Sequence, residues 1–409
     1  MSQIIIVTSN YWPEPTGIAI YATDLAESLQ GDGFKVSVLT SLPHYPWWNI
    51  PREFKHFGEG TTQHNSVKVV RANHLIPSRM NALVRIKFEI SLWRNLRRVS
   101  KLKLGNDFDA VIAYMPTIAA GLTGKRIAKK LGIPFGLIVQ DLSGAGAKQS
   151  GLRGGALISR LALAVEGYTL KAADLLVVVS PAMRDVIMGL GINASKVSEI
   201  TNYAARKVEL VNQNIARRNF GWASNEFVVI HTGNMGAKQN LENVIEASKE
   251  LRSHLKVKIY LVGHGNQENN LKKLCKGLEN IVIREAVVNN QYSALLSAAD
   301  LLLVNERSTQ IEMSLPSKLT SYLYSERPVL AAVPKGGATW KFLDGIAELV
   351  EAGSPTLLAR AIEDLSQDPE KRKRLASKGL EFARKNLDAE IGRKKYLDWV
   401  NSLIQSKRV

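Results

Sequence analysis

Two loops rich in glycine and polar residues contain the residue types that bind phosphate. They span residues 10–18 and 232–240, and each follows an apolar run and precedes a pattern typical of an amphipathic helix. A strand that enters a helix through glycines presents backbone N–H groups at the positive end of the helix dipole, where phosphate binds well. Two such units facing one another would form a cleft for a phosphorylated ligand, which is typical of an enzyme. The residues that we single out in these loops are Gly17, Ile18, Asn234, Gly236 and Lys238.

Each loop also has an ordinary structural interpretation. Gly17 allows a ligand to approach the backbone, or it serves a tight turn between a strand and a helix. Lys238 can reach a diphosphate as a point charge, or it is a solvated surface lysine. A third loop follows another apolar run and contains Gly263 and His264, which is a weak signal by itself.

The segment 314–321 has the pattern of a helix start, with a proline in the first turn and hydroxyl groups beside it. Its N–H groups, together with a lysine, would form a second anion site, and a simple capped helix is the alternative. The residues involved are Pro316, Ser317, Lys318 and Leu319.

Carboxylate and aromatic side chains follow two further predicted strands. Asp141 lies just past the apolar run 135–139 and before the flexible sequence 143–147, so it is either a catalytic carboxylate or a solvated loop residue. The loop 43–48 concentrates aromatic rings, which either stack on a sugar or pack into the core. Ligands of open parallel sheets bind outside the carboxyl ends of the strands, where all these loops would lie.

The composition is that of a folded protein of two or three domains, with 409 residues, 45% of them hydrophobic and 22% charged. The single cysteine, Cys275, forms no internal disulfide, which favours a reducing, cytoplasmic location. The seven histidines are scattered without the spacing of a metal site, so we expect no metal. We also find no basic leader of a secretory signal and no apolar run long enough to span a bilayer.

A net charge of +17 calls for an anionic partner: a membrane surface, a nucleic acid or a phosphorylated substrate. A helix predicted over residues 83–103 offers one explanation, because basic and apolar residues fall on opposite faces, with Trp93 near the edge. It is either a membrane-surface element or a surface helix packed on the sheet. We expect no nucleic-acid binding, since no recognition motif accompanies the charge. The basic residues are Lys87, Arg94, Arg97, Arg98 and Lys101, and the apolar ones are Val84, Phe88, Leu92, Leu96, Val99 and Leu102.

Short apolar runs alternate with helical patterns through both halves, which predicts an α/β fold of two open, doubly wound parallel sheets. A polar, strand-free stretch over 202–226 separates the halves, and a charged helical tail covers 369–408. The predicted strands are 4–7, 36–39, 67–70, 110–114, 135–139 and 175–179 in the first half, and 228–231, 258–262, 281–284, 301–304 and 329–332 in the second.

Taken together, these loops resemble the family 4 retaining glycosyltransferases of the GT-B fold. The likeness is greatest to the branch that builds bacterial exopolysaccharide, including colanic-acid and O-antigen fucosyl- or N-acetylfucosaminyltransferases. The matching stretches follow the family's order through most of the chain. They are residues 10–18, 139–142, 179–180, 233–236, 262–265 and 315–319.

The resemblance implies a Rossmann-like acceptor-binding domain over 1–205 and a Rossmann-like nucleotide-sugar-binding domain over 206–388, facing across a cleft. For the helix over 389–409, a return to the first domain is left open. The donor is a UDP- or GDP-linked sugar, and no cofactor or metal is implied. Asn234, Lys238 and the segment 317–319 would bind the donor diphosphate.

In the first domain, the resemblance places Gly17 against the transferring sugar and Asp141 near the reacting sugar, in a catalytic role. One departure concerns two glutamates, eight positions apart, that many relatives carry. The equivalent positions here are Met313 and Ser321, with Glu312 beside the first. Recognition of the ribose by a glutamate is therefore not expected.

We thus expect an enzyme at the cytoplasmic face of the plasma membrane that transfers a sugar, with retention, to a saccharide linked to a lipid such as undecaprenyl diphosphate. Two other readings stay open: a sugar-nucleotide epimerase, and a non-catalytic subunit that binds nucleotide sugars. The missing glutamates favour the second of these.

Overall fold

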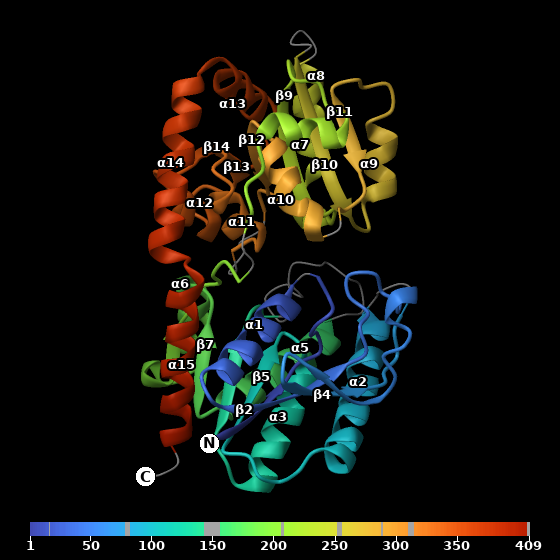
Figure 1. Ribbon diagram of the computed structural model, residues 1–409, viewed down its shortest axis with the longest axis vertical. Coiled ribbons are helices and arrows are strands. Elements are labelled where there is room, and N and C mark those ends of the chain that lie inside the picture. The colour runs from blue at the N-terminus through green and yellow to red at the C-terminus, as the bar shows by residue number, and fades with distance from the viewer. Residues whose placement is uncertain are drawn as a thin grey trace. The chain divides into compact units, whose positions relative to one another are not determined.

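The computed structural model describes residues 1–15, 17–77, 82–142, 156–205, 208–251, 256–287, 289–309 and 315–406. Its contacts divide the chain into two compact units (Figure 1). Unit 1 combines Met1–Ala205 with Ala389–Val409, and unit 2 is Arg206–Asp388.

Unit 1 contains an eight-stranded sheet in the order β3-β4-β2-β1-β5-β6-β7-β8. All neighbouring strands are parallel except β3, which runs antiparallel to β4 at one edge. The sequence did not predict β3 or β8. The strands are β1 (Gln3–Val7), β2 (Lys35–Ser41), β3 (Gly60–His64), β4 (Val67–Ala72), β5 (Ala110–Met115), β6 (Phe135–Val139), β7 (Leu175–Val178) and β8 (Val197–Glu199).

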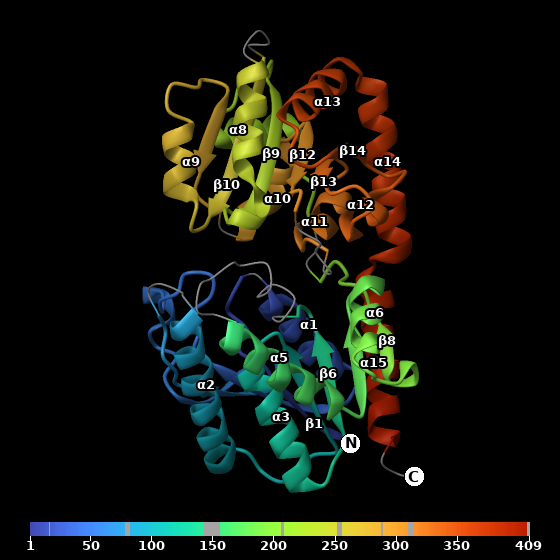
Figure 2. The ribbon, with the colours of Figure 1, turned by 180° about the vertical axis from the view of Figure 1, so that it is seen from behind.

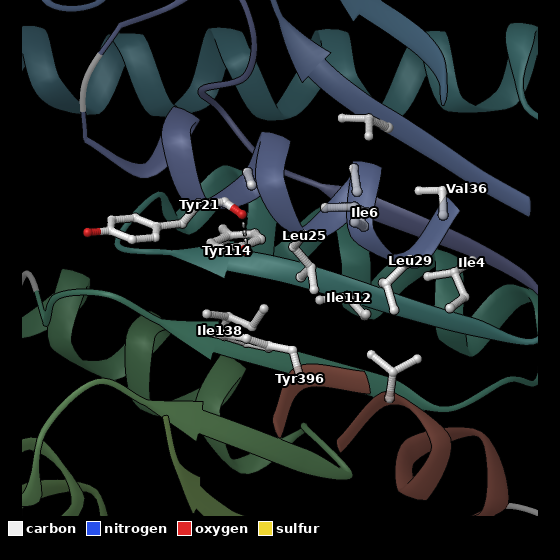
Figure 3. Packing of buried hydrophobic residues seen from close by; sticks show 14 of the residues in the cluster. Ile4, Ile6, Tyr21, Leu25, Leu29, Val36, Ile112, Tyr114, Ile138 and Tyr396 are labelled. Carbon is white, nitrogen blue, oxygen red and sulfur yellow. Dashed lines mark hydrogen bonds between the residues drawn. The ribbon is translucent and has the colours of Figure 1, made fainter. Parts of the chain in front are cut away.

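Helices cover both faces of this sheet (Figures 1 and 2). One face packs against α1 and α15, and the other packs against α2 and α3, with α5 beside α3. Figure 3 shows the first face, where Tyr114 of β5 donates a hydrogen bond from its hydroxyl to the carbonyl oxygen of Tyr21 in α1, at 3.3 Å. The helices are α1 (Ile18–Gly31), η1 (Arg52–Phe54), α2 (Ala82–Lys103), α3 (Ile118–Leu131), α5 (Ala156–Lys171), α6 (Pro181–Gly189), η2 (Ala194–Lys196) and α15 (Ala389–Gln405).

Helix α2 differs in one respect from the predicted pattern. Its apolar face is buried through Phe88, Leu92, Leu96 and Val99, as expected. Leu102, which the sequence places on the same apolar side, is 68% exposed near the end of the helix. Val99 is the last buried residue of α2, and Leu102 lies about one turn beyond it.

Unit 2 contains a six-stranded, wholly parallel sheet in the order β11-β10-β9-β12-β13-β14. Helices α8, α9 and α13 contribute to the core on one face, and α7, α10, α11, α12 and α14 to the core on the other. Each unit is therefore a Rossmann-like α/β domain, which confirms the predicted fold class. The strands are β9 (Phe227–Asn234), β10 (Val257–His264), β11 (Ile281–Arg284), β12 (Leu301–Asn305), β13 (Val329–Val333) and β14 (Glu348–Glu351), the last of which was not predicted.

The helices of unit 2 begin where the sequence supplies local signals. Helix α13, for example, has Ser354 as its N-cap, whose hydroxyl accepts a hydrogen bond from the Leu357 amide, and Pro355 in its first turn. The helices are α7 (Gln213–Phe220), η3 (Ala237–Gln239), α8 (Leu241–Glu250), α9 (Glu268–Leu274), α10 (Asn289–Ala298), α11 (Lys318–Tyr324), α12 (Ala338–Leu343), α13 (Pro355–Gln367) and α14 (Pro369–Asn386).

The charged tail is two helices rather than one, because α14 ends at Asn386 and α15 begins at Ala389. Helix α15 packs into unit 1, where its Arg393 forms an ion pair with Asp24 of α1 at 2.5 Å. Close packing also involves glycine: a Cβ added at Gly392 would lie 2.1 Å from Cδ1 of the Tyr203 ring.

We predict that Gly392→Ala lowers the thermal stability of the protein, because the new methyl group overlaps a buried ring. Overpacking of this kind costs about 1–3 kcal/mol. Gly167→Ala is the control, since Gly167 also lies within a helix and an added Cβ meets nothing within 4 Å there. Thermal unfolding should show a lower midpoint for Gly392→Ala only. Equal midpoints for the two variants would contradict this packing.

Candidate active site

The sheet of unit 2 opens at the point where β9 and β12 part. β9 pairs with β12 only through Val229 and Ile230, whereas it pairs with β10 along its whole length. Beyond Ile230, side chains bridge the opening. His231 lies with Nδ1 3.1 Å from the carbonyl oxygen of Leu303, and the Tyr322 hydroxyl accepts a hydrogen bond from the Thr232 amide at 2.8 Å. A doubly wound sheet places its ligand site at such a point.

The loop after β9 is held by the loop after β10. The amide of Met235 donates to the carbonyl oxygen of His264 at 2.8 Å, and the Gly236 amide donates to Oε1 of Gln239 at 3.2 Å. A Cβ added at Gly263 would lie 1.8 Å from the carbonyl oxygen of Gly233, so only glycine fits there. The amides of Met235 and Gly236, in the loop that we expected to bind phosphate, thus make hydrogen bonds within the protein. Side chains are therefore the more important candidates for binding phosphate here.

Lys238 follows in the same loop and is exposed to solvent. Its backbone carbonyl accepts a hydrogen bond from the amide of Arg307, at 2.9 Å, in the segment after β12. Asn305 at the end of β12 adds two more links, donating from Nδ2 to the carbonyl oxygens of Gln239 and Asn240 at 2.8 and 3.0 Å. The backbone that carries Lys238 is therefore fixed to β12.

Lys318 begins α11 and approaches the same edge of the sheet. Its Nζ lies 3.1 Å from Nε2 of the buried His231. A Cβ added at Gly233 would lie 3.6 Å from this Nζ, so the ammonium group lies beside the exposed end of β9. The structure thus gathers lysines from two distant segments, around positions 238 and 318, at the carboxyl edge of one sheet.

The other predicted residues of unit 2 surround this edge with different exposures. Asn234, His264 and Ser317 are exposed, Pro316 is half-buried and Leu319 is buried. The prediction that Pro316 lies in the first turn is wrong, because α11 begins at Lys318 with Ser317 as its N-cap, and the Ser317 side chain makes no capping hydrogen bond. Ser321 of α11 is half-buried. Glu312, Met313 and Ser314 lie outside the described residues.

In unit 1, the loop after β1 carries Gly17 directly before α1. Gly17 has a φ of 65°, a conformation that favours glycine, and an added Cβ would lie 3.5 Å from Cε1 of the Tyr45 ring. Ile18, the first residue of α1, is half-buried. Thr16 lies outside the described residues.

Glu14 ties this loop to the loop after β2. Its Oε1 accepts hydrogen bonds from the amides of His44 and Tyr45 at 2.7 and 2.8 Å, and its Oε2 accepts one from Nδ2 of Asn10 at 2.7 Å. Burial raises the pKa of the Glu14 carboxyl to about 7, although these hydrogen bonds oppose the shift. Burial also lowers the pKa of His44 to about 4, so its ring is neutral at neutral pH.

Asp141 lies just past β6, two strands from β1 in the sheet. It is half-buried, and its Oδ1 accepts a hydrogen bond from the following amide, that of Leu142, at 2.8 Å. Beside it, Oε1 of Gln140 accepts a hydrogen bond from Nδ2 of Asn202 at 2.9 Å. The flexible sequence predicted over 143–147 lies outside the described residues.

The aromatic loop 43–48 divides between the two interpretations that the sequence left open. His44 is buried, whereas Tyr45, Trp47 and Trp48 are each partly exposed. The Trp48 ring meets that of Phe88 in α2 edge to face, with ring centroids 6.0 Å apart. One part of the loop therefore packs as core, and the other part offers rings to solvent.

Sequence reasoning missed His231 and Asn305 as organisers of the site. A signal existed for both, because each is a polar residue that ends an otherwise apolar run and is buried in the structure. Among the residues that the structure describes, no group of three or more His, Cys, Asp or Glu side chains could hold a metal ion. None of the described helices has the length and apolar character needed to cross a bilayer.

The raised pKa of Glu14 predicts a pH-dependent contribution to stability. The folded state holds the Glu14 proton up to about pH 7, whereas the unfolded chain releases it near pH 4.5. The folded state thus binds more protons between these values, so this contribution is full below pH 4.5 and is lost as pH rises through 7. Removing the ionisable group should remove that loss.

Wild type should therefore lose stability relative to Glu14→Gln as the pH rises from 4.5 to 8, measured by urea unfolding at each pH. The comparison with the variant is needed because His44 acts in the opposite direction: its lowered pKa costs stability as the pH falls from 6.5 towards 4. A constant difference between wild type and variant at every pH would refute the prediction.

Comparisons with known proteins agree with this architecture. Residues 16–202 match the family model of the glycosyl transferase 4-like domain, and residues 212–382 match that of glycosyl transferases group 1. Over 404 residues the chain is 28% identical to WcaI of Escherichia coli K12, named as a colanic acid biosynthesis glycosyl transferase, covering 95% of this chain and 97% of WcaI.

Two solved structures share the fold over the whole chain. Sucrose-phosphate synthase from Thermosynechococcus elongatus is similar with a TM-score of 0.78 at 14% identity, covering 100% of both chains. Anabaena Alr3699/HepE, solved in complex with UDP-glucose, is similar with a TM-score of 0.70 at 18% identity, covering 98% of this chain and all of that one. With its 4-like domain followed by its group 1 domain, the chain belongs to the glycosyltransferases of the GT-B fold.

Proposed function

We propose that this glycosyltransferase moves a sugar, with retention at the anomeric carbon and without a metal, from a nucleoside-diphosphate sugar to a lipid-linked saccharide in bacterial exopolysaccharide or O-antigen synthesis. The observation that carries the proposal is the presence of Lys238 and Lys318 at the carboxyl edge of the unit 2 sheet, where β9 and β12 part. The likeness to WcaI supports the pathway, and the UDP-glucose complex of HepE supports the class of donor.

In this proposal, unit 2 binds the donor. When the bond between the sugar and the diphosphate breaks, negative charge develops on the diphosphate oxygens, and a fixed positive charge stabilises it. The two lysines supply that charge, and Asn234, Gly236, Gly263 and His264 form the surrounding surface with the segment 316–319. The close approach of Gly263 to Gly233 leaves no room for a side chain at position 263.

Unit 1, in this proposal, binds the acceptor through the edge that carries Gly17, Ile18 and Asp141. The hydrogen bonds of Glu14 fix the loop that ends at Gly17, while Asp141 provides a carboxylate close to the reacting sugar. The partly exposed rings of Tyr45 and Trp48 offer apolar surface for a saccharide.

We further propose that α2 contacts an anionic membrane surface at the cytoplasmic face. Its exposed stripe alternates apolar and basic residues at helical spacing, which suits an interface between headgroups and acyl chains. Leu83 and Ile90 are 64% and 50% exposed, and Lys87 and Arg94 are exposed beside them. Arg98, by contrast, pairs with Glu59 at 2.5 Å, so it contributes less net charge to this surface.

Replacing Lys238 by alanine tests the donor site. We expect turnover to fall by about 10²–10³-fold, the usual cost of removing one group that stabilises developing charge, with little change in thermal stability. The donor is first identified by thermal-shift screening with UDP- and GDP-sugars, since a ligand of the native state raises the melting temperature. Lys249→Ala, at an exposed lysine of α8 that pairs with Glu246, is the control.

Two outcomes would contradict the proposal. Near-normal sugar transfer by Lys238→Ala would show that Lys238 does not stabilise the departing diphosphate. Conversion of the donor without any acceptor would indicate the epimerase instead.

Replacing Lys87 and Arg94 together by alanine tests the membrane surface. Each basic residue near an anionic surface contributes about 1 kcal/mol, so binding to vesicles with phosphatidylglycerol should weaken by roughly 30-fold. The control is the double variant Lys129→Ala and Lys130→Ala, which removes two exposed charges from α3 in the same unit. Equal loss of vesicle binding in both double variants would show that net charge, rather than α2, sets the affinity.

A further inference from the structure

His231 is a fully buried histidine at the point where β9 leaves β12. Its Nδ1 lies 3.1 Å from the carbonyl oxygen of Leu303. A carbonyl oxygen can only accept a hydrogen bond, so Nδ1 carries the proton and donates it. Burial, and secondly the charge of Lys318, lower the pKa of His231 well below its ordinary value, so the ring is neutral near pH 7. Nε2 is then left with a lone pair as an acceptor.

That lone pair faces Lys318. The distance from Lys318 Nζ to His231 Nε2 is 3.1 Å, so the ammonium group donates a hydrogen bond to the neutral ring. The two residues are 87 positions apart in sequence, on β9 and at the start of α11. The chain Leu303–His231–Lys318 therefore connects the backbone of β12 to the ammonium group through a rigid ring.

A lysine normally loses much rotamer freedom when it is held in one position. Its side chain is a flexible stem of four carbons, and fixing the rotamer of that stem costs about 2 kcal/mol in entropy. A site in which the lysine is already oriented does not incur that cost again when its ligand binds. Here the ring holds Nζ beside Gly233, at the edge of the sheet where anions can approach.

We infer that His231 is a positioning residue, which holds the ammonium group of Lys318 in place for the donor diphosphate. The inference rests on the proposed function, because it assigns the Lys318 side chain to the diphosphate. It adds a residue that does not touch the ligand, and it explains why a polar ring is buried at the end of an apolar strand.

Two substitutions separate the two hydrogen bonds of the ring. In His231→Asn, the side-chain amide takes the place of Nδ1 and keeps the bond to Leu303, but no acceptor takes the place of Nε2 beside Lys318. In His231→Gln, the amide oxygen takes the place of Nε2 and preserves that acceptor. Calorimetric titration with UDP and GDP should show affinity about tenfold weaker for His231→Asn, the size of one hydrogen bond to a charged group. His231→Gln should bind within about threefold of wild type.

A double-mutant cycle distinguishes positioning from simple loss of stability. In a Lys318→Ala background, His231→Asn should cause no further loss of affinity, because the residue acts through the lysine. Asn280→Ala is the control for stability: this buried asparagine donates to the Ser248 carbonyl at 2.7 Å, at the opposite edge of the sheet. It should lower the melting temperature without weakening nucleotide affinity.

The outcomes separate the inference from the proposed function. If wild type binds neither UDP nor GDP, the proposed function fails, and the inference fails with it. If wild type binds but the losses from His231→Asn and Lys318→Ala simply add, or His231→Gln does not rescue, the inference alone is overturned.

Discussion

The early separation of β9 from β12 is the constraint on which the arrangement of unit 2 depends. Parallel strands of one sheet end at the same edge, and the separation leaves backbone groups there without partners in the ladder. Side chains take over: the His231 ring meets the Leu303 carbonyl, and the Tyr322 hydroxyl meets the Thr232 amide. Because Tyr322 belongs to α11, the same contacts that close the opening also position the helix that begins with Lys318.

In unit 1, a buried charge holds the loop after β1 in place. The guanidinium group of Arg71 donates to the hydroxyl of Thr62 and the carbonyl of Trp12, at 2.8 and 2.7 Å, and lies 4.6 Å from the ring centroid of Phe57. Burial lowers its pKa to about 10, so it stays protonated at neutral pH. It joins the loop after β1 to β3 and β4, while Glu14 joins the same loop to the loop after β2. The two terminal nitrogens of the guanidinium group make these hydrogen bonds, whereas the buried Nε has no hydrogen-bond partner among the described residues, so the cost of burying this charge is offset only in part.

The sequence predicts most of this fold because buried parallel strands are continuous apolar runs, and these are visible without any partner. The missed strands lack that signal. β3 reads Gly-Thr-Thr-Gln-His and forms only by pairing with β4, and β8 has three residues. The break at Leu387 and Asp388 in the tail likewise depends on where α15 packs, which periodicity does not report.

The residues of the candidate site likewise include some that the sequence indicates and some that it does not. Loops with glycine and lysine are visible as local patterns, so Gly17, Asn234, Lys238 and the segment 316–319 could be selected from the sequence. Contacts between residues far apart in the sequence, such as that between His231 and Lys318, could not be selected in this way. In the sequence, such a contact is indicated only by an isolated polar residue at the end of an apolar run.

The position of α15 has a consequence for synthesis on the ribosome. Residues 1–205 emerge first, yet one face of their sheet is covered by Tyr396, Trp399 and Leu403, which are translated almost 200 residues later. One apolar face of a nascent unit 1 therefore stays uncovered while unit 2 is synthesised. Apolar surface that stays exposed in this way makes a nascent chain prone to aggregation.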